Sequence, residues 1–190
     1  MDRLLILGAG GHGVNCLEIA RQMGRFSEIA FLDDGQLGKV LCDCPVIGGL
    51  RDIERLQGLY TAAFVAFGNN EMRERWMREL ARLQYGTLTL VSPRACVSCY
   101  AELGAGSVVF PFSSVEPRAK VGEGCILSAG VIVNHDAEVH AHTLIYSHTV
   151  IRPYSIIGDH TTIGSGCIIG QSSTIPLGSH LPDGTILAKN

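Results

Sequence analysis

The sequence of 190 residues has little charge, few aromatic residues and no concentration of either sign of charge. Charged side chains make up 17% and aromatic side chains 6%, and 15 basic residues against 18 acidic ones leave a net charge of -3. No block of Lys or Arg is present. Because nucleic acids and anionic membrane surfaces are bound by clustered positive charge, we expect neither as a partner.

Long apolar runs are also missing, although 46% of the residues are apolar and the mean hydropathy is +0.24. Gly, Ser, Thr or a charged residue interrupts every run before the roughly 18 residues that a membrane-spanning helix needs. The apolar run at residues 4–7 is too short for the core of a signal peptide. We therefore expect a cytoplasmic protein that buries its apolar residues in one large or two small domains.

The seven cysteines are odd in number and irregular in spacing, which does not suit a disulfide framework, so reduced thiols are expected. Cys96 and Cys99 form a C-x-x-C pair that could supply half of a zinc site, but no second pair stands at ligand spacing. We expect both to be small core residues, and we expect no bound metal.

Short apolar runs alternate with helix-like segments in residues 1–86, the first predicted domain. Strands that alternate with helices are typical of a small parallel α/β sheet, here a Rossmann-like half-domain. The expected strands are 4–7, 29–32 and 62–67, and the expected helices are 9–23 and 71–83.

Residues 87–190, the second predicted domain, follow a six-residue repeat. Steps of six from Val91 to Leu187 reach only Val, Ile or Leu, and the fifth position of each hexad, from Ala95 to Thr185, is always small or β-branched. Two inward positions per hexad predict a parallel β-helix with three short strands in each coil of 18 residues. Glycines such as Gly104 and Gly122 stand where the corners turn.

The motif G-A-G-G-H-G at residues 8–13 follows a predicted strand and opens a predicted helix, a context that suits phosphate binding at the helix N-terminus. Asp33 and Asp34 end the second strand, about 20 residues further on, and Gly68 follows the third. A dinucleotide domain needs two such halves and this segment is only one, which favours a nucleoside diphosphate-sugar over NAD. Alternatively, the glycines serve only to let the helix pack closely on the strand and bind no ligand. His12 favours the binding role, because an imidazole at a helix N-terminus is well placed to contact a ligand.

Histidines are concentrated in the second domain: His135, His140, His142, His148, His160 and His180. A neutral imidazole there could accept a proton while a thioester is opened. His142 and His160 are 18 apart and should stack, solvated, on one corner; a metal held by corner histidines is an alternative. His135 differs because Asp136 follows it, and a carboxylate can orient an imidazole if the backbone bends between them.

Six short motifs over nearly the whole chain point to one family: G-A-G-G-H-G at 8–13, F-L-D-D at 31–34, F-G-N-N-E at 67–71, V-S-P-R-A at 91–95, V-I-V-N-H-D at 131–136 and I-L-A-K-N at 186–190. Together they resemble the NeuD and PglD group of sugar acyltransferases. The resemblance implies a left-handed β-helix, a homotrimer with active sites between neighbouring β-helices, and acetylation by acetyl-CoA of an amino sugar linked to UDP or GDP.

The resemblance also implies roles for individual residues. His135 matches the general base and Asp136 the acid that increases its basicity, with direct transfer and no acyl-enzyme. The nucleotide-sugar residues implied are Gly10, Gly11, His12, Asp33, Asp34 and Gly68. Leu144 stands where the family has a second His near the acetyl carbonyl, and hexad alignment adds Ser165 and Asp183 as acetyl-CoA contacts. The sequence stops at Asn190, short of the family's G-x-P-A-like tail.

Three other functions stay open on sequence alone. A sugar O-acetyltransferase of the sialic-acid type could use the same base. A nucleotide-sugar-binding scaffold without acyl transfer is consistent with Leu144 and the missing tail. A dehydrogenase would need NAD bound at the glycine-rich motif.

Overall fold

The computed structural model describes residues 2–187 and divides the chain into two compact units between Leu90 and Val91. Each unit has its own hydrophobic core. Among the described residues, no helix is long and apolar enough to cross a membrane.

The first unit is a twisted sheet with the strand order β3-β4-β2-β1-β5-β6. All neighbouring strands are parallel except β3 and β4, which form an antiparallel hairpin. The bounds are β1 Asp2–Leu7, β2 Phe26–Leu32, β3 Val40–Leu41, β4 Cys44–Gly48, β5 Ala62–Val65 and β6 Gly86–Thr87.

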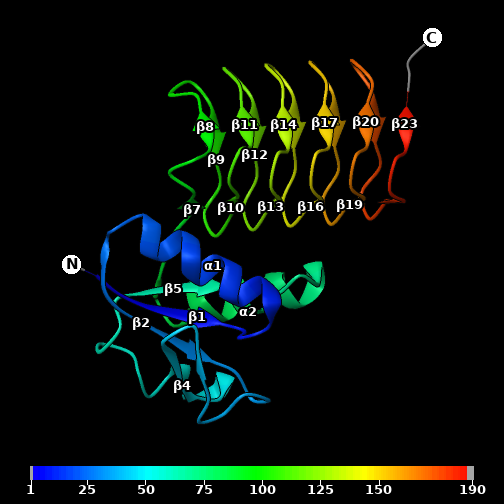
Figure 1. Ribbon diagram of the computed structural model, residues 1–190. Helices are drawn as coiled ribbons and strands as arrows, with labels where there is room; N and C mark the ends of the chain where they lie inside the picture. Colours follow the sequence, from blue (N-terminus) through cyan, green and yellow to red (C-terminus); the bar gives the residue numbers. More distant parts are fainter. Residues whose placement is uncertain (1, 188–190) are drawn as a thin grey trace. The chain divides into compact units, whose positions relative to one another are not determined.

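Two helices pack beside this sheet, α1 (Gly11–Gln22) and α2 (Asn70–Arg82), with a short 3-10 helix η1 (Leu50–Ile53) after β4 (Figure 1). Residues 4–7 of β1 are all fully buried, because a parallel strand in the middle of the sheet is covered on both faces. Leu5 and Leu7 share a core with Met77 and Leu80 of α2. The predicted alternation of strands and helices is confirmed, and the hairpin, η1 and β6 were not predicted.

The second unit is the predicted left-handed parallel β-helix, whose coils stand side by side in Figure 1. Each strand pairs with the strand 18 residues later, for example Val115 with Val133 and Val133 with Ile151. The strands are β7 Leu90–Val91, β8 Cys96–Val97, β9 Glu102–Leu103, β10 Val108–Val109, β11 Ser114–Val115, β12 Lys120–Val121, β13 Ile126–Leu127, β14 Ile132–Val133, β15 Glu138–Val139, β16 Leu144–Ile145, β17 Val150–Ile151, β18 Ile156–Ile157, β19 Thr162–Ile163, β20 Ile168–Ile169, β21 Thr174–Ile175, β22 His180–Leu181 and β23 Ile186–Leu187.

The second residue of each of these strands points inward and forms the core, as the hexad pattern predicts. Inward polar side chains at the fifth hexad position bond to backbone, as when Thr149 Oγ1 donates to the Gly164 carbonyl at 2.7 Å. Glycines let successive coils approach closely: a Cβ on Gly122 would lie 2.7 Å from the Ala141 nitrogen. Burial of branched side chains and close coil stacking therefore act together.

The coils turn at three edges, which we name by their loops. Edge A comprises 98–100, 116–118, 134–136, 152–154 and 170–172. Edge B comprises 104–106, 122–124, 140–142, 158–160 and 176–178. Edge C comprises 92–94, 110–112, 128–130, 146–148, 164–166 and 182–184.

Candidate active site

The predicted nucleotide-sugar residues of the first unit gather at the carboxyl ends of β1, β2 and β5. These strands are neighbours, and the loops that follow them are joined by backbone hydrogen bonds: Gly8 N donates to the Leu32 carbonyl at 2.9 Å and Ala66 N to the Leu7 carbonyl at 2.8 Å. Ligands of open α/β sheets bind at this edge.

The glycines of the motif divide into two groups. Gly8 has φ of +102°, and a Cβ on Gly13 would lie 2.0 Å from the Gly8 carbonyl oxygen, so both are required for α1 to begin against β1. A Cβ on Gly10 or Gly11 would meet nothing within 4 Å. The two predicted ligand positions are therefore open, and the packing explanation of the motif applies to its outer glycines.

The two aspartates at the end of β2 hold the surrounding loops. Asp33 Oδ2 accepts from Ala9 N at 2.8 Å and Asp33 Oδ1 from Gly35 N at 2.9 Å. Asp34 Oδ1 accepts from Leu50 N at 2.9 Å. Both carboxylates therefore shape the predicted site through backbone N–H groups, in addition to any contact with a ligand.

His12 lies in the first turn of α1, where its Nε2 is 3.6 Å from Cys16 Sγ. Burial and, to a smaller degree, the nearby Arg73 guanidinium lower the pKa of His12 to about 4, so the imidazole is neutral at physiological pH. Arg73 is fully buried and donates to the Phe67 and Gly68 carbonyls at 2.9 and 3.2 Å. It thereby holds the loop that contains Gly68, a role that nothing in the sequence indicated.

His135 and Asp136 meet at edge A of the β-helix, between β14 and β15. The His135 Nδ1 and Asp136 Oδ2 atoms are 2.7 Å apart, and 42% of the His135 side chain is exposed. Adjacent side chains can meet here because Asp136 has φ of +59°, a left-handed conformation that turns the corner. The bend that this pairing requires is thus present.

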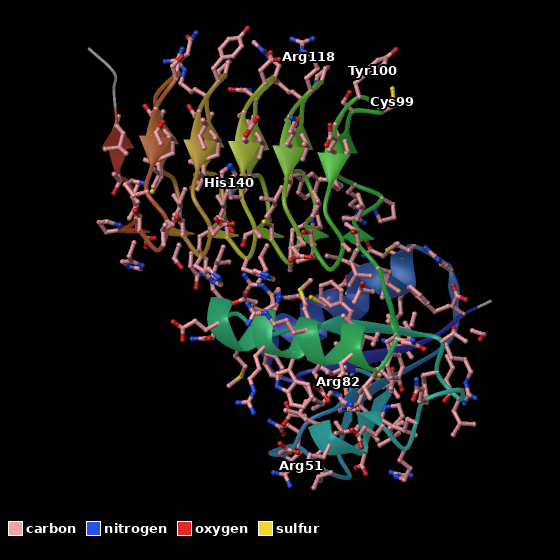
Figure 2. The ribbon with its side chains drawn as sticks, turned by 180° about the vertical axis from the view of Figure 1, so that it is seen from behind. Arg51, Arg82, Cys99, Tyr100, Arg118 and His140 are labelled. Carbon is pink, nitrogen blue, oxygen red and sulfur yellow. The ribbon has the colours of Figure 1, made fainter. Side chains whose placement is uncertain are left out.

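Residues of the neighbouring coils surround the pair. Arg118, 18 residues before Asp136, donates from Nε to Oδ1 and from a terminal nitrogen to Oδ2, each at 2.7 Å. Glu116 accepts from the His135 backbone nitrogen at 2.9 Å. Tyr154, 18 residues after Asp136, stands edge-on to the imidazole with 5.6 Å between ring centroids. Figure 2 shows Arg118 and Tyr100 on this edge, and His140 away from it.

The electrostatics of this corner favour an ionised carboxylate. Hydrogen bonds from Arg118, and then from His135, hold the pKa of Asp136 well below its usual range. Because an ionised carboxylate can only accept, His135 Nδ1 must carry the shared proton, which leaves Nε2 of a neutral ring with a lone pair. The arrangement can accept a proton at Nε2.

The predicted acetyl-CoA residues lie near edge C instead. Ser165 N donates to Asp183 Oδ1 at 2.7 Å, a hydrogen bond that links successive coils and brings the two residues together. Leu144 is the outward residue of β16, which leads into the same edge, and it is 7% exposed. Edges A and C bound the sheet of β8, β11, β14, β17, β20 and β23, so one chain presents its two groups of predicted residues on opposite borders of that sheet.

Two sequence expectations outside these groups are wrong. His142 does stack on His160, with ring centroids 5.3 Å apart, but it is 4% exposed and so not solvated. Cys96 and Cys99 are exposed, because Cys96 faces outward beside the inward Val97 and Cys99 lies in a corner loop. In residues 2–187, no group of three or more His, Cys, Asp or Glu is placed to hold a metal.

Residues 3–80 match the PglD N-terminal domain family, and residues 142–176 match the bacterial transferase hexapeptide family (six repeats). The acetyltransferase domain of PglB from Neisseria gonorrhoeae FA1090 is 30% identical, with 100% of this chain and 93% of that chain covered and a TM-score of 0.94. The same domain in complex with acetyl coenzyme A is 31% identical, covers 100% and 97%, and has a TM-score of 0.90.

This chain belongs to the NeuD/PglD family of sugar acyltransferases. It is therefore an acyltransferase, as the motifs predicted. The likeness extends in fold to a mutant of GDP-perosamine N-acetyl transferase from Caulobacter crescentus, solved with CoA and GDP-perosamine. That protein is 21% identical, with 100% and 94% coverage and a TM-score of 0.81.

Within this NeuD/PglD member, the contacts of Glu116, Arg118 and Tyr154 with the His–Asp pair were not predicted. A signal for two of them was available, since Arg118 and Tyr154 lie 18 residues before and after Asp136. The end motif at 186–190 lies partly outside the described residues, which stop at Leu187.

Proposed function

We propose that this protein is an acetyl-CoA-dependent N-acetyltransferase that acts on an amino sugar linked to UDP or GDP. The observation that carries the proposal is the pair at edge A, in which an exposed imidazole is held by an ionised carboxylate 2.7 Å from Nδ1. Family membership supports the acyl transfer, and the relative solved with acetyl coenzyme A supports the donor.

His135 acts as general base in the proposed reaction. Its Nε2 takes a proton from the sugar amine as the amine nitrogen forms a bond to the thioester carbonyl carbon. The carbon–sulfur bond then breaks, and CoA leaves as a thiolate that recovers the proton. Asp136 stays ionised and stabilises the imidazolium that forms in between. No acyl-enzyme is needed, because amine and thioester are held together.

The nucleotide-sugar is assigned to the open edge of the first unit. Gly10 and Gly11 leave room for close approach of a diphosphate to the backbone of the α1 N-terminus, whose dipole favours negative charge. Neutral His12 and the loop at Gly68, held by Arg73, complete this surface, while Asp33 and Asp34 keep the loops in position.

Acetyl-CoA is assigned to edge C, at Ser165 and Asp183 with Leu144 beside them. Leu144 has no group that could polarise the acetyl carbonyl, so a backbone N–H or another side chain does so. This difference is the one observation that favours other functions of the site, a sugar O-acetyltransferase or a binding scaffold.

The proposed assembly is a homotrimer in which each active site combines edge A of one protomer with edge C of the next. The sheet between these edges carries an outward apolar row at Ile132, Val150, Ile168 and Ile186, of which Ile168 is 39% and Ile186 65% exposed. Three copies that turn this face toward a common axis would bury the row and bring the two edges together. A cytoplasmic location stays a prediction.

A substrate panel tests the proposal. Thiol release from acetyl-CoA is measured with UDP- and GDP-linked 4-amino-4,6-dideoxy sugars and with their 4-hydroxy counterparts. Turnover with an amino sugar alone supports the N-acetyltransferase. Turnover with the hydroxy sugars points to O-acetylation, and nucleotide-sugar binding without any turnover points to the scaffold.

A further inference from the structure

The carboxylate of Asp136, beside the proposed base, is bound by a residue of the preceding coil. Arg118 donates two parallel hydrogen bonds of 2.7 Å to Asp136, one to each carboxylate oxygen. A two-pronged contact of this kind fixes the plane of a carboxylate, which a single ion pair does not. Arg118 is 65% exposed, so its contact with Asp136 is not imposed by burial in the core.

One oxygen of Asp136, Oδ2, accepts a hydrogen bond from Arg118 and also contacts the imidazole of His135. Asp136 Oδ2 lies 2.7 Å from Arg118 and 2.7 Å from His135 Nδ1. Asp136 stands in a corner with a left-handed backbone, so no β-ladder on its own residue determines where its side chain points. The guanidinium therefore sets the position from which Oδ2 meets Nδ1.

A second contact from the same corner loop fixes the backbone of the base. Glu116 accepts from His135 N through Oε2 and from the Asn134 side chain through Oε1, each at 2.9 Å. Tyr154, on the next coil along the chain, packs edge-on against the imidazole and restricts its rotation. His135 is thus in contact with Glu116, Asp136 and Tyr154, and Arg118 acts on it through Asp136. Lys120 and Glu138 line the same hollow as Arg118 and Asp136.

We propose that Arg118 is the positioning residue of the proposed base: by clamping both oxygens of Asp136 it selects the His135 tautomer with hydrogen on Nδ1 and leaves the Nε2 lone pair for the substrate amine. The kinetic part of this inference rests on the proposed function, whereas the tautomer is a property of the protein without substrate. Without the clamp, the Asp136 carboxylate rotates and the neutral ring samples both tautomers.

The test compares Arg118→Met and Arg118→Lys with a matched control, Lys120→Met. Lys120 forms an ion pair with Glu138 at 3.7 Å on the adjacent strand β12, so the control removes an exposed cation without touching Asp136. Two readouts are used: the ring ¹⁵N shifts of His135, assigned with His135→Gln, and the pH profile of acetyl transfer. Unchanged melting temperatures establish that the variants fold.

The wild-type protein and Lys120→Met should show a single Nδ1–H tautomer, and Arg118→Met a mixture. In Arg118→Met, kcat should fall roughly 10- to 100-fold with little change in KM, because the base is misplaced. Loss of the nearby cation should also move the acid limb of the profile to higher pH. Arg118→Lys, which keeps the charge but not the two-pronged contact, should restore the acid limb and only part of kcat.

A single Nδ1–H tautomer in Arg118→Met would overturn the inference, whatever the enzyme acetylates. Absence of acetyl transfer in the wild-type protein would instead refute the proposed function, and the tautomer comparison would still decide the role of Arg118. Equal losses in Lys120→Met and Arg118→Met would also overturn it, since a general effect of surface charge would explain both.

Discussion

At the scale of single residues, one backbone dihedral decides whether the imidazole and the carboxylate of the proposed base can meet. On a straight strand His135 and Asp136 would point to opposite faces, and the φ of +59° at Asp136 brings Oδ2 to within 2.7 Å of Nδ1. The same hexad position has positive φ in other corners and is glycine in several of them, as at Gly124 and Gly130, so the repeat marks the turn at Asp136. The pattern does not give the side-chain contact itself, because that contact depends on how the neighbouring coils hold Asp136.

The glycine-rich loop yields a prediction that separates folding from binding. Gly10→Ala should fold normally, because its Cβ would meet nothing within 4 Å, but should weaken nucleotide-sugar binding about 10-fold or more, because the methyl group occupies the approach to the phosphates. Gly13→Ala should lose about 3 kcal/mol or more of stability, since its Cβ would lie 2.0 Å from the Gly8 oxygen. Thermal unfolding and calorimetric titration with UDP- and GDP-sugars check both variants. Unchanged binding by Gly10→Ala would remove the loop from the substrate site.

His12 yields a pH prediction with a definite sign. Its pKa in the folded protein is lowered from 6.5 to about 4, so below pH 6.5 the unfolded chain takes up a proton that the folded chain does not. Stability should therefore fall by roughly 2–3 kcal/mol as the pH drops from 6.5 to 4, and should not change on this account above 6.5. Urea unfolding at several pH values checks this, with His12→Gln expected to lose less over that range. An NMR titration midpoint near 6.5 for His12 would contradict the prediction.

At the scale of elements, the 18-residue coil is the feature that sequence predicts best. Every hexad needs one branched and one small residue on the inside of the coil. The six-residue period therefore stays visible even where a single position departs from the pattern. The hairpin of β3 and β4 shows the opposite case, because β3 has only two residues, β4 contains Pro45, and the turn residues Cys42 and Asp43 have positive φ without glycine. The hexads also placed His142 beside His160 correctly but did not indicate that His142 is buried.

Coil stacking yields a prediction about two glycines with different constraints. Gly122→Ala should destabilise the β-helix by about 1–3 kcal/mol, because its Cβ would lie 2.7 Å from the Ala141 nitrogen of the next coil. Gly178→Ala, at φ of +67° with nothing within 4 Å, should cost only about 1 kcal/mol, from backbone conformation alone. Denaturant unfolding ranks the two variants. If Gly178→Ala were more destabilising than Gly122→Ala, the short distance between successive coils would not be what excludes a side chain at Gly122.

At the scale of the whole molecule, the proposed site is complete only when two protomers meet. The base lies on edge A and the proposed acetyl-CoA residues near edge C, with a full sheet between them. Sequence alone implied this assembly only through family resemblance, because periodicity defines a coil but not which of its faces packs on a neighbour. The apolar row that ends at Ile186 is the observation on which the proposed face rests.

Mixed trimers test the shared site. His135→Gln removes the base on edge A, and Ser165→Trp blocks edge C at an exposed corner, so each should be inactive alone. Coexpressed with different tags and purified as mixed trimers, they should regain part of the activity, because some sites combine an intact edge A with an intact edge C. No recovery in verified mixed trimers would show that base and acetyl-CoA residues act within one chain.

The most direct test of the central claim is acetyl transfer by His135→Gln, with the product identified by mass and by NMR. With the amino sugar found in the substrate panel, the wild-type protein should form an amide on the sugar nitrogen. His135→Gln should lose roughly 10²- to 10⁴-fold in kcat while it still binds the nucleotide-sugar and acetyl-CoA. A variant that keeps the wild-type rate, or a product acetylated on oxygen, would contradict the account.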